Sequence, residues 1–370
     1  MTSGTTTSWQ PVLNWGWRGE TEVATGYVSY SYSTAPLGHC TEYYWKNFTY
    51  HDPFGTPHYF AGEGYIQTGP VYYCRPQHDS VVATATDGSG YSINANPSAT
   101  GSVTIALTTS SGKSLSVPQN AGNGSAKTTD RNGNEISTDG SGNFYDTLSS
   151  TAATLVVSGT GTVSSPQKFT YTTSTGGSAY YQVNYTNYTV ATNFGISGIT
   201  EYKSAAAVPL VTGVELPDTS QYTFTYETTP GTCAPYSGTT CVTARLKTVT
   251  LPTGGMITYT YSGGYDGIFS DGSAAGLMRQ TPDGTWTYNR TLGTGSNVGA
   301  SATLITAPML SYETNSDQTI EQFQGIYPTQ TDVYQGTAPS FSSVPISQGS
   351  LQTSGLLQET QTCYNGSANP

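Results

Sequence analysis

Gln221-Tyr222-Thr223-Phe224-Thr225-Tyr226 decides the fold class of this chain, because aromatic side chains and threonines alternate along it. Successive side chains of an extended strand point to opposite faces, so the aromatics share one face and the threonines the other. The same alternation occurs in Met256-Ile257-Thr258-Tyr259-Thr260-Tyr261, and in shorter form at 169–172 and 285–288. This pattern is typical of half-buried β-strands and predicts an all-β fold.

Turn signals separate the alternating segments. They are the dipeptides Asp87-Gly88, Asn132-Gly133, Asp139-Gly140, Asp271-Gly272 and Asp283-Gly284. No segment has an amphipathic helical pattern, and 43 glycines and 20 prolines leave few places for a long helix. We therefore expect stacked antiparallel β-hairpins, arranged as a β-sheet spiral or a sandwich, with essentially no α-helix.

The composition indicates an ordered protein with a polar but weakly charged surface. Charged residues make up 9% of the chain, against about 25% in an average soluble protein. Disordered chains lack aromatic residues, whereas this chain has 29 Tyr, 10 Phe and 5 Trp. Threonine and tyrosine fit the pleated surface of a sheet, which again favours β-structure.

The charge balance disfavours two classes of partner. The formal net charge is −11 and no basic run occurs, so the attraction that drives nucleic-acid binding is missing. No segment approaches the roughly 20 apolar residues that span a bilayer, so we expect no membrane insertion. The N-terminus lacks the pattern of a signal peptide. We expect that a leader was removed or that the chain begins inside a longer protein.

Related hairpin units recur along the chain. Leu216-Pro217 and Leu251-Pro252 lie 35 residues apart, and each pair leads into an aromatic/threonine strand. A weaker copy spans 280–288, and a related unit lies upstream at 130–148. Hairpins that each need a neighbour to cover them predict a stacked array.

These units resemble bacterial RHS/YD-repeat proteins. The resemblance rests on DRNGNEISTDGSGNFYDTL (130–148), on YTFTYE followed by RLKTVTLPTGGMITYTYSGG (222–264), and on PDGTWTYNR (282–290). It covers roughly residues 80 to 370 and is strongest from 200 to 300. In that family, hairpin repeats coil into a large hollow β-shell that can enclose a C-terminal toxin or effector, and related proteins act at cell surfaces.

The resemblance implies a non-catalytic structural segment, upstream of the main repeat array of a secreted or cell-surface protein. Its partners would be neighbouring repeats of its own longer polypeptide. The family's core-associated region and autoprotease have no match here, so no catalytic residue is carried over. We expect three regions: an aromatic and histidine-rich N-terminal region (1–80), a hairpin region with YD-like turns (81–205), and RHS/YD-like hairpin repeats truncated at the C-terminus (206–370).

The five cysteines predict two disulfides. Cys233 and Cys241 flank a Pro/Gly loop, and Cys40 and Cys74 bracket an aromatic segment. Cys363 is left over, and we expect its partner beyond Pro370. A zinc site formed by Cys40, Cys74 and His78 is an alternative, but its spacing matches no compact ligand motif, and a disulfide is favoured.

Two functional alternatives concern residues 1–80. Tyr43, Tyr44, Trp45 and Tyr59 could form a stacking platform for polysaccharide, although an ordinary aromatic strand pair explains them equally. A glycan-directed hydrolase would use the cluster at 39–79, which contains all four histidines (His39, His51, His58 and His78). It requires either two carboxylates about 5–10 Å apart or a histidine and a carboxylate that converge in a pocket. The available carboxylates are Glu42, Asp52, Glu63 and Asp79.

One segment has the acidic spacing of a calcium loop. Asp130, Asn132, Asn134 and Asp139 follow the start of that pattern. The sixth-position glycine and the acidic twelfth ligand are missing, since Glu135 and Ser141 stand there. Two hairpin turns account for the same residues and are favoured, with calcium kept as the alternative and no other cofactor expected.

Overall fold

The computed structural model confirms the all-β prediction. It describes residues 2–3, 6–8, 25–74, 77–98, 101–120, 124–149, 151–204, 206–236, 238–341, 343–346 and 354–363. Within these ranges the regular elements are β-strands and one short 3₁₀ helix, η1 (Gly295–Asn297), and no α-helix occurs. No helix in the described part of the chain is long and apolar enough to cross a membrane.

The chain forms two compact units. One comprises Asn14–Gln182, and the other comprises Met1–Leu13 together with Val183–Pro370. The chain passes from the first to the second within strand β17 (Ser178–Tyr188). The expected limits at residues 80 and 205 do not coincide with these units.

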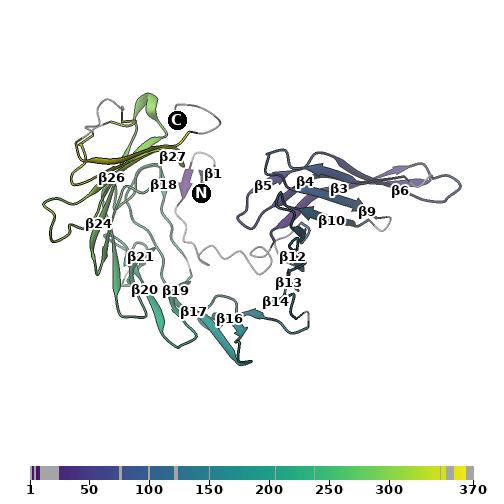
Figure 1. The fold of residues 1–370 in the computed structure, drawn as a ribbon, viewed down its shortest axis with the longest axis horizontal. Coiled ribbons are helices and arrows are strands. Elements are labelled where there is room, and N and C mark those ends of the chain that lie inside the picture. The colour runs from purple at the N-terminus through teal and green to yellow at the C-terminus, as the bar shows by residue number, and fades with distance from the viewer. Residues whose placement is uncertain are drawn as a thin grey trace. The chain divides into compact units, whose positions relative to one another are not determined.

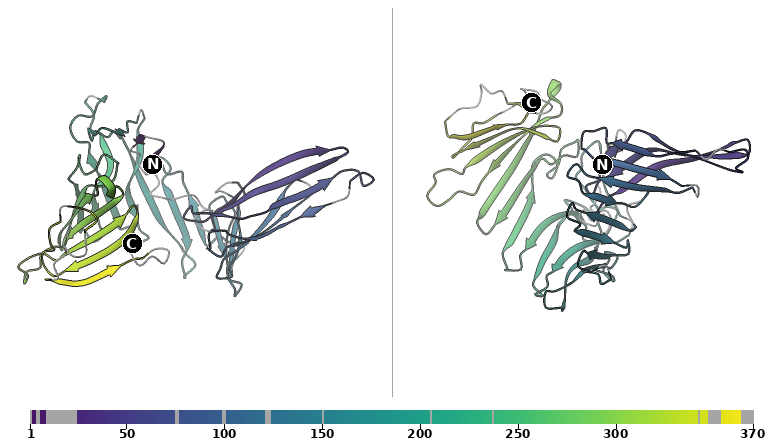
Figure 2. Two further views of the ribbon diagram at one scale, coloured as in Figure 1. Left: turned by 90° about the horizontal axis from the view of Figure 1, so that it is seen from above. Right: turned by 45° about the vertical axis from the view of Figure 1, so that its right-hand side comes forward.

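The Asn14–Gln182 unit begins with a five-stranded antiparallel sheet in the order β3-β4-β6-β7, with β5 also paired to β4. Its strands are β3 (Tyr27–Leu37), β4 (Cys40–His51), β5 (Pro57–Tyr59), β6 (Glu63–Thr68) and β7 (His78–Asp79). Figure 2 shows β3 and β4 as a long hairpin, drawn in purple.

A meander of shorter antiparallel strands follows, each paired with the next (Figure 1). Its strands are β8 (Val81–Thr84), β9 (Ser92–Pro97), β10 (Val103–Thr108), β11 (Ser114–Ser116), β12 (Ala126–Thr129), β13 (Glu135–Thr138), β14 (Asn143–Asp146), β15 (Leu155–Ser158) and β16 (Gln167–Thr172). The strand order continues through β17.

One core joins the five-stranded sheet to the start of the meander. Trp45 and Phe48 from β4 are buried with Ile93 from β9 and Leu107 from β10. Residues on both sides of position 80 therefore share a single hydrophobic core, which explains why that position is not a unit boundary.

The second unit is dominated by a longer antiparallel meander, in which each strand from β19 to β28 pairs with the next. Its strands are β19 (Val208–Glu215), β20 (Gln221–Thr228), β21 (Val242–Thr250), β22 (Met256–Tyr261), β23 (Gly276–Thr281), β24 (Gly284–Leu292), β25 (Ala300–Thr306), β26 (Gln318–Gln324), β27 (Tyr327–Tyr334) and β28 (Leu356–Gln361). A small separate sheet contains β1 (Thr2–Ser3), β2 (Thr6–Ser8) and β18 (Ile199–Thr200).

The three predicted proline hairpins are all present in this meander. The Leu216-Pro217 turn joins β19 to β20, and Leu216 N–H donates to the Ser220 carbonyl at 2.9 Å. Leu251-Pro252 joins β21 to β22 in the same way, with a 2.7 Å bond from Leu251 N–H to the Gly255 carbonyl. The Thr281–Gly284 turn joins β23 to β24.

Candidate functional site

A β-bulge in β4 sets the two faces of the five-stranded sheet. The register between β3 and β4 shifts between Ser29 and Ser31, and Asn47 on β4 has a φ of 58°. The bulge places an extra residue in β4. Trp45 and Phe48 consequently both point into the core, although three positions separate them.

The opposite face of this sheet, here called the outer face, carries polar and aromatic side chains. Its members used below are Tyr27 on β3, Glu42, Tyr44, Lys46 and His51 on β4, Tyr59 on β5, and Glu63, Tyr65 and Gln67 on β6. Cross-strand register pairs Tyr44 with Tyr65, Glu42 with Gln67, and Lys46 with Glu63. Residues directly opposite in an antiparallel pair share a face, so these six side chains form three rows.

Glu42 connects two of these rows through its hydrogen bonds. Its carboxylate accepts hydrogen bonds from the Tyr44 hydroxyl at 2.8 Å and the Tyr65 hydroxyl at 2.7 Å. The two rings lie 5.3 Å apart and are tilted by 50°. The hydrogen bond from Tyr65, followed by that from Tyr44, lowers the pKa of Glu42. Desolvation and the bond to Glu42 raise the pKa of Tyr65 to about 12, so at neutral pH Glu42 is ionised and Tyr65 keeps its proton.

The next row adds a balanced pair of charges. Lys46 Nζ lies 2.8 Å from Glu63 Oε2 and 5.1 Å from the centre of the Tyr44 ring. The two charged side chains are 48% and 40% exposed. An exposed pair of this kind contributes about 0–1 kcal/mol to stability. The pair neutralises itself, so Glu42 and Asp79, which lies opposite Tyr65 on β7, leave the face with a net negative charge.

A second aromatic group lies further along β4. The rings of Tyr27 and His51 stack with centres 4.4 Å apart, and Ser29 Oγ lies 3.0 Å from His51 Nε2. Burial and the neighbouring His58 lower the pKa of His51, so its ring is neutral at pH 7. Tyr59, opposite Thr49 on the adjacent strand, is 57% exposed.

The structure divides the four predicted stacking residues between the two faces. Tyr44 and Tyr59 lie on the outer face, whereas Tyr43 packs against the core and Trp45 is fully buried. The expectation of one platform that includes Trp45 must be corrected, because adjacent strand residues alternate between faces. Tyr65, and not Trp45, lies beside Tyr44 on the outer face. The sequence signal that would have identified it is the alternation along β6, where Glu63, Tyr65 and Gln67 alternate with Gly64 and Ile66.

Both predicted disulfides are present. Cys40 is bonded to Cys74 and Cys233 to Cys241, which indicates an oxidising environment. The alternative zinc site is thereby excluded, because its two thiols are bonded to each other and His78 Nε2 lies 2.7 Å from the Pro97 carbonyl. Cys363 is exposed and has no disulfide partner among the described residues, so its expected partner beyond Pro370 stays a prediction.

The carboxylates considered for hydrolysis are engaged in separate local contacts. Glu42 and Glu63 belong to rows about 13 Å apart, given the rise of a strand, which exceeds the separation of a glycosidase pair. Asp52 Oδ1 accepts the backbone N–H groups of Phe54 and Thr56. Asp79 is exposed on β7.

One histidine of the 39–79 cluster is buried between two carboxylates. His58, 6% exposed, lies 2.5 Å through Nδ1 from Asp87 Oδ2 and 3.7 Å through Nε2 from Asp52 Oδ2. His58 thereby links Asp52, in the turn after β4, to Asp87, in the turn between β8 and β9. The contact with Asp87 connects segments 29 residues apart, which no local pattern could indicate.

The residues considered for calcium form two separate turns. Asp130 Oδ1 accepts the backbone N–H groups of Asn132 and Asn134, and its Oδ2 accepts the Asn134 side chain at 2.8 Å. Asp139 makes the same three bonds with Ser141 and Asn143. The turns lie at opposite ends of β13, and no group of three or more His, Cys, Asp or Glu side chains that could hold a metal ion occurs in the described part of the chain.

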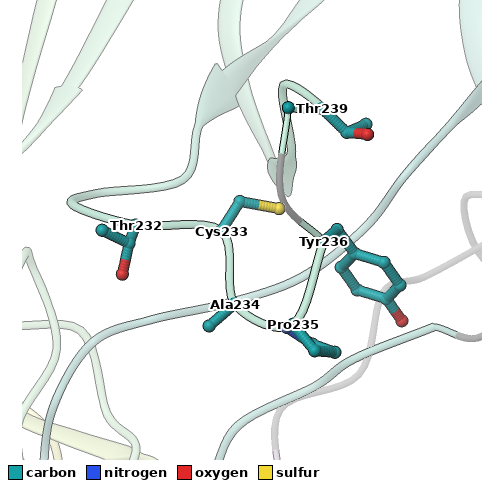
Figure 3. Close-up of a pocket in the computed structure, with 7 residues that line it drawn as sticks. Thr232, Cys233, Ala234, Pro235, Tyr236 and Thr239 are labelled. Carbon is teal, nitrogen blue, oxygen red and sulfur yellow. The ribbon is translucent and has the colours of Figure 1, made fainter.

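An open pocket of about 400 Å³ lies inside the Cys233–Cys241 loop (Figure 3). Its lining consists of Thr232, Cys233, Ala234, Pro235, Tyr236, Gly238 and Thr239. The lining contains no carboxylate, lysine, arginine or histidine, and the Tyr236 hydroxyl is directed to the Ser204 carbonyl. The pocket therefore has no charged or imidazole side chain in its described lining that could bind a charged ligand or act as a general acid or base.

No protein-family model matches this chain, and no curated protein matches it significantly.

Proposed function

We propose that this chain is a non-catalytic structural segment of a secreted, RHS/YD-repeat-like protein, in which it contributes to a β-sheet wall at or outside the cell surface. The observation that carries the proposal is the uninterrupted succession of antiparallel hairpins from β19 to β28, where each strand pairs with its sequence neighbours. The resemblance of residues 130–148, 222–264 and 282–290 to YD repeats supports the same reading.

The cores of the second unit are small and local, as expected of an array. Val208, Leu210 and Tyr226 form one cluster with Val242, whereas a separate cluster joins Ala302 and Ile320 further along the meander. Each strand is covered mainly by its neighbours, so stability is distributed along the array and not held in one centre.

The last strand supports a continuation of the sheet. Among the described residues, β28 pairs only with β27, and five of its six residues are exposed. An edge strand offers unpaired backbone groups to any further strand. Within the proposed protein, the neighbouring repeats of the same polypeptide would be the partner.

The two disulfides fit a secreted location. The hydrolase alternative is not favoured, because Glu42 and Glu63 lie far apart and His58, which meets Asp87 and Asp52, is buried and only 6% exposed. The first test is the size of the native protein. An antibody raised against residues 183–370 is expected to detect, in the secreted or surface fraction of the source cells, a species much larger than 39.0 kDa. A mature secreted species of 39.0 kDa, folded and complete, would contradict the proposal.

A further inference from the structure

We propose that the outer face of β3–β6 binds an uncharged polysaccharide, with Glu42, Tyr44 and Tyr65 as its central contacts. The inference concerns a different part of the chain from the hairpin array and does not depend on the proposed wall. It rests on three observations: the hydrogen bonds to the Glu42 carboxylate, the placement of the tyrosine rings, and the pairing of Lys46 with Glu63.

The hydrogen bonds fix the central side chains before any ligand arrives. Tyr44 and Tyr65 both donate to Glu42, and Gln67 also contacts this carboxylate. A carboxylate has about four acceptor positions, so one remains for a sugar hydroxyl. Each phenol oxygen can likewise accept a hydroxyl proton. Side chains that are already ordered lose little entropy when they bind.

The tyrosine rings supply apolar surface beside the Glu42 carboxylate. An aromatic ring with a polar tip suits a ligand that has both apolar C–H faces and hydroxyls. Tyr59 is 57% exposed and lies across from Thr49. The β3 partners of Thr49 and Tyr44 are four positions apart, which places Tyr59 roughly 13 Å from Tyr44 along the sheet at the rise of a strand. The face is therefore long enough for a chain of several sugars and not only for a single one.

The charges of the face favour an uncharged ligand. Lys46 is paired with Glu63, and Glu42 is stabilised as an anion by its hydroxyl donors. No cation of the outer face is left to attract an acidic polymer, since His51 is neutral at pH 7. Glu42 and Asp79, which lies opposite Tyr65 on β7, repel an acidic polymer. A basic polymer would have to compete with Lys46 for Glu63 and with the two tyrosine hydroxyls for Glu42.

A disulfide anchors the sheet at the end where Glu42 lies. Cys40 begins β4 and is bonded to Cys74, which follows β6. The two strands that carry Glu42 and Tyr65 are thus held together by a covalent link as well as by their backbone pairing.

The test measures retention of the full chain on microcrystalline cellulose, chitin and an insoluble β-1,3-glucan, followed by calorimetry with a soluble hexasaccharide of the glycan retained. We expect retention on at least one of them, unchanged in about 1 M NaCl because no ion pair is involved. Tyr44→Ala combined with Tyr65→Ala should weaken binding at least tenfold. Tyr312→Ala, which removes an 81% exposed tyrosine of the other unit, should leave binding unchanged.

Two milder variants keep the test decisive if the double alanine variant unfolds. Glu42→Gln, and Tyr44→Phe combined with Tyr65→Phe, preserve the side-chain volumes and should each weaken binding about fivefold or more, with unchanged circular dichroism. The proposal is overturned if none of the three glycans retains the chain, if salt abolishes the retention, or if folded variants of Glu42, Tyr44 and Tyr65 bind as the wild type does.

Discussion

Arg245 holds Glu227 through two parallel hydrogen bonds. Nε donates to Oε2 at 2.7 Å, and Nη2 donates to Oε1 at 2.8 Å. The guanidinium also lies 4.0 Å from the centre of the Tyr261 ring, and its Nη1 donates to the Asp266 carbonyl at 2.8 Å. One side chain on β21 thereby links β20, β22 and the loop that follows β22.

Breaking this pair should destabilise the second unit strongly. Glu227→Ala removes the partner of a guanidinium that is only 6% exposed. An unpaired buried charge costs about 3–5 kcal/mol. Arg245→Lys should also be destabilising, because an ammonium cannot make the two parallel bonds.

The measurement for both variants is the free energy of unfolding in urea. Lys127→Ala, which breaks an exposed pair with Glu135, serves as the control and should cost at most about 1 kcal/mol. Equal effects of Glu227→Ala and Lys127→Ala would contradict this account.

Asp87 should make the first unit sensitive to acid. Hydrogen bonds from the Ser89 side chain and backbone, and then from His58, lower the pKa of Asp87 to about 2. Its pKa in the unfolded chain is about 3.9. The stabilisation is therefore fully present above about pH 4 and is lost as the pH falls through 2. The difference in unfolding free energy between wild type and Asp87→Asn should shrink from pH 5 to pH 2. A difference that stays constant over this range would show that the Asp87 charge is not responsible.

The contribution of Asp332 to stability should depend on pH in the opposite direction from that of Asp87. It is fully buried, and burial raises its pKa, although Gln330 donates to both of its oxygens at 2.9 Å. A carboxyl whose pKa is raised in the folded state favours folding at low pH, and the native state loses stability as the pH rises through that pKa. Asp332→Asn should therefore increase the free energy of unfolding at pH 7 and change it much less at pH 4. A loss of stability at pH 7 would show that the charged form is the one that the fold prefers.

The two disulfides should contribute unequally to stability. Cys40–Cys74 closes a separation of 34 residues and Cys233–Cys241 one of 8. Loop-closure entropy assigns about 4 kcal/mol to the longer link and about 2.5 kcal/mol to the shorter one. Cys40→Ser with Cys74→Ser should thus lower the urea midpoint of its unit more than Cys233→Ser with Cys241→Ser lowers that of the other. The reverse order would mean that native-state contacts, and not chain entropy, dominate both effects.

The sequence was sufficient where a strand interacts mainly with its neighbours. In β20 the predicted alternation is present in the burial pattern, since Phe224 and Tyr226 are buried and Thr223 and Thr225 are exposed. The hairpins around Pro217 and Pro252 were predictable for the same reason, because a turn and its two strands are contiguous in sequence.

The sequence was insufficient where long-range contacts decide a side chain's surroundings. The bulge at Asn47 moves Phe48 to the side of Trp45, so β4 does not follow a simple alternation. Tyr65 reaches Glu42 only because β6 pairs with β4 in one register, across 23 residues of chain. The core that joins Trp45 to Leu107 likewise depends on how two sheets pack, which strand patterns do not specify.

The central claim is that the hairpin array is a segment of a larger sheet, and hydrogen–deuterium exchange at β28 tests it most directly. In an antiparallel edge strand about half of the backbone N–H groups point away from the sheet. The amides of Leu356–Gln361 that point away from β27 should therefore exchange rapidly in the 370-residue chain and become protected in the full-length secreted protein, whereas the amides of β25 and β26 should be slow in both. Equal and rapid exchange of β28 in both proteins would show that the sheet ends there, and would contradict the proposed wall.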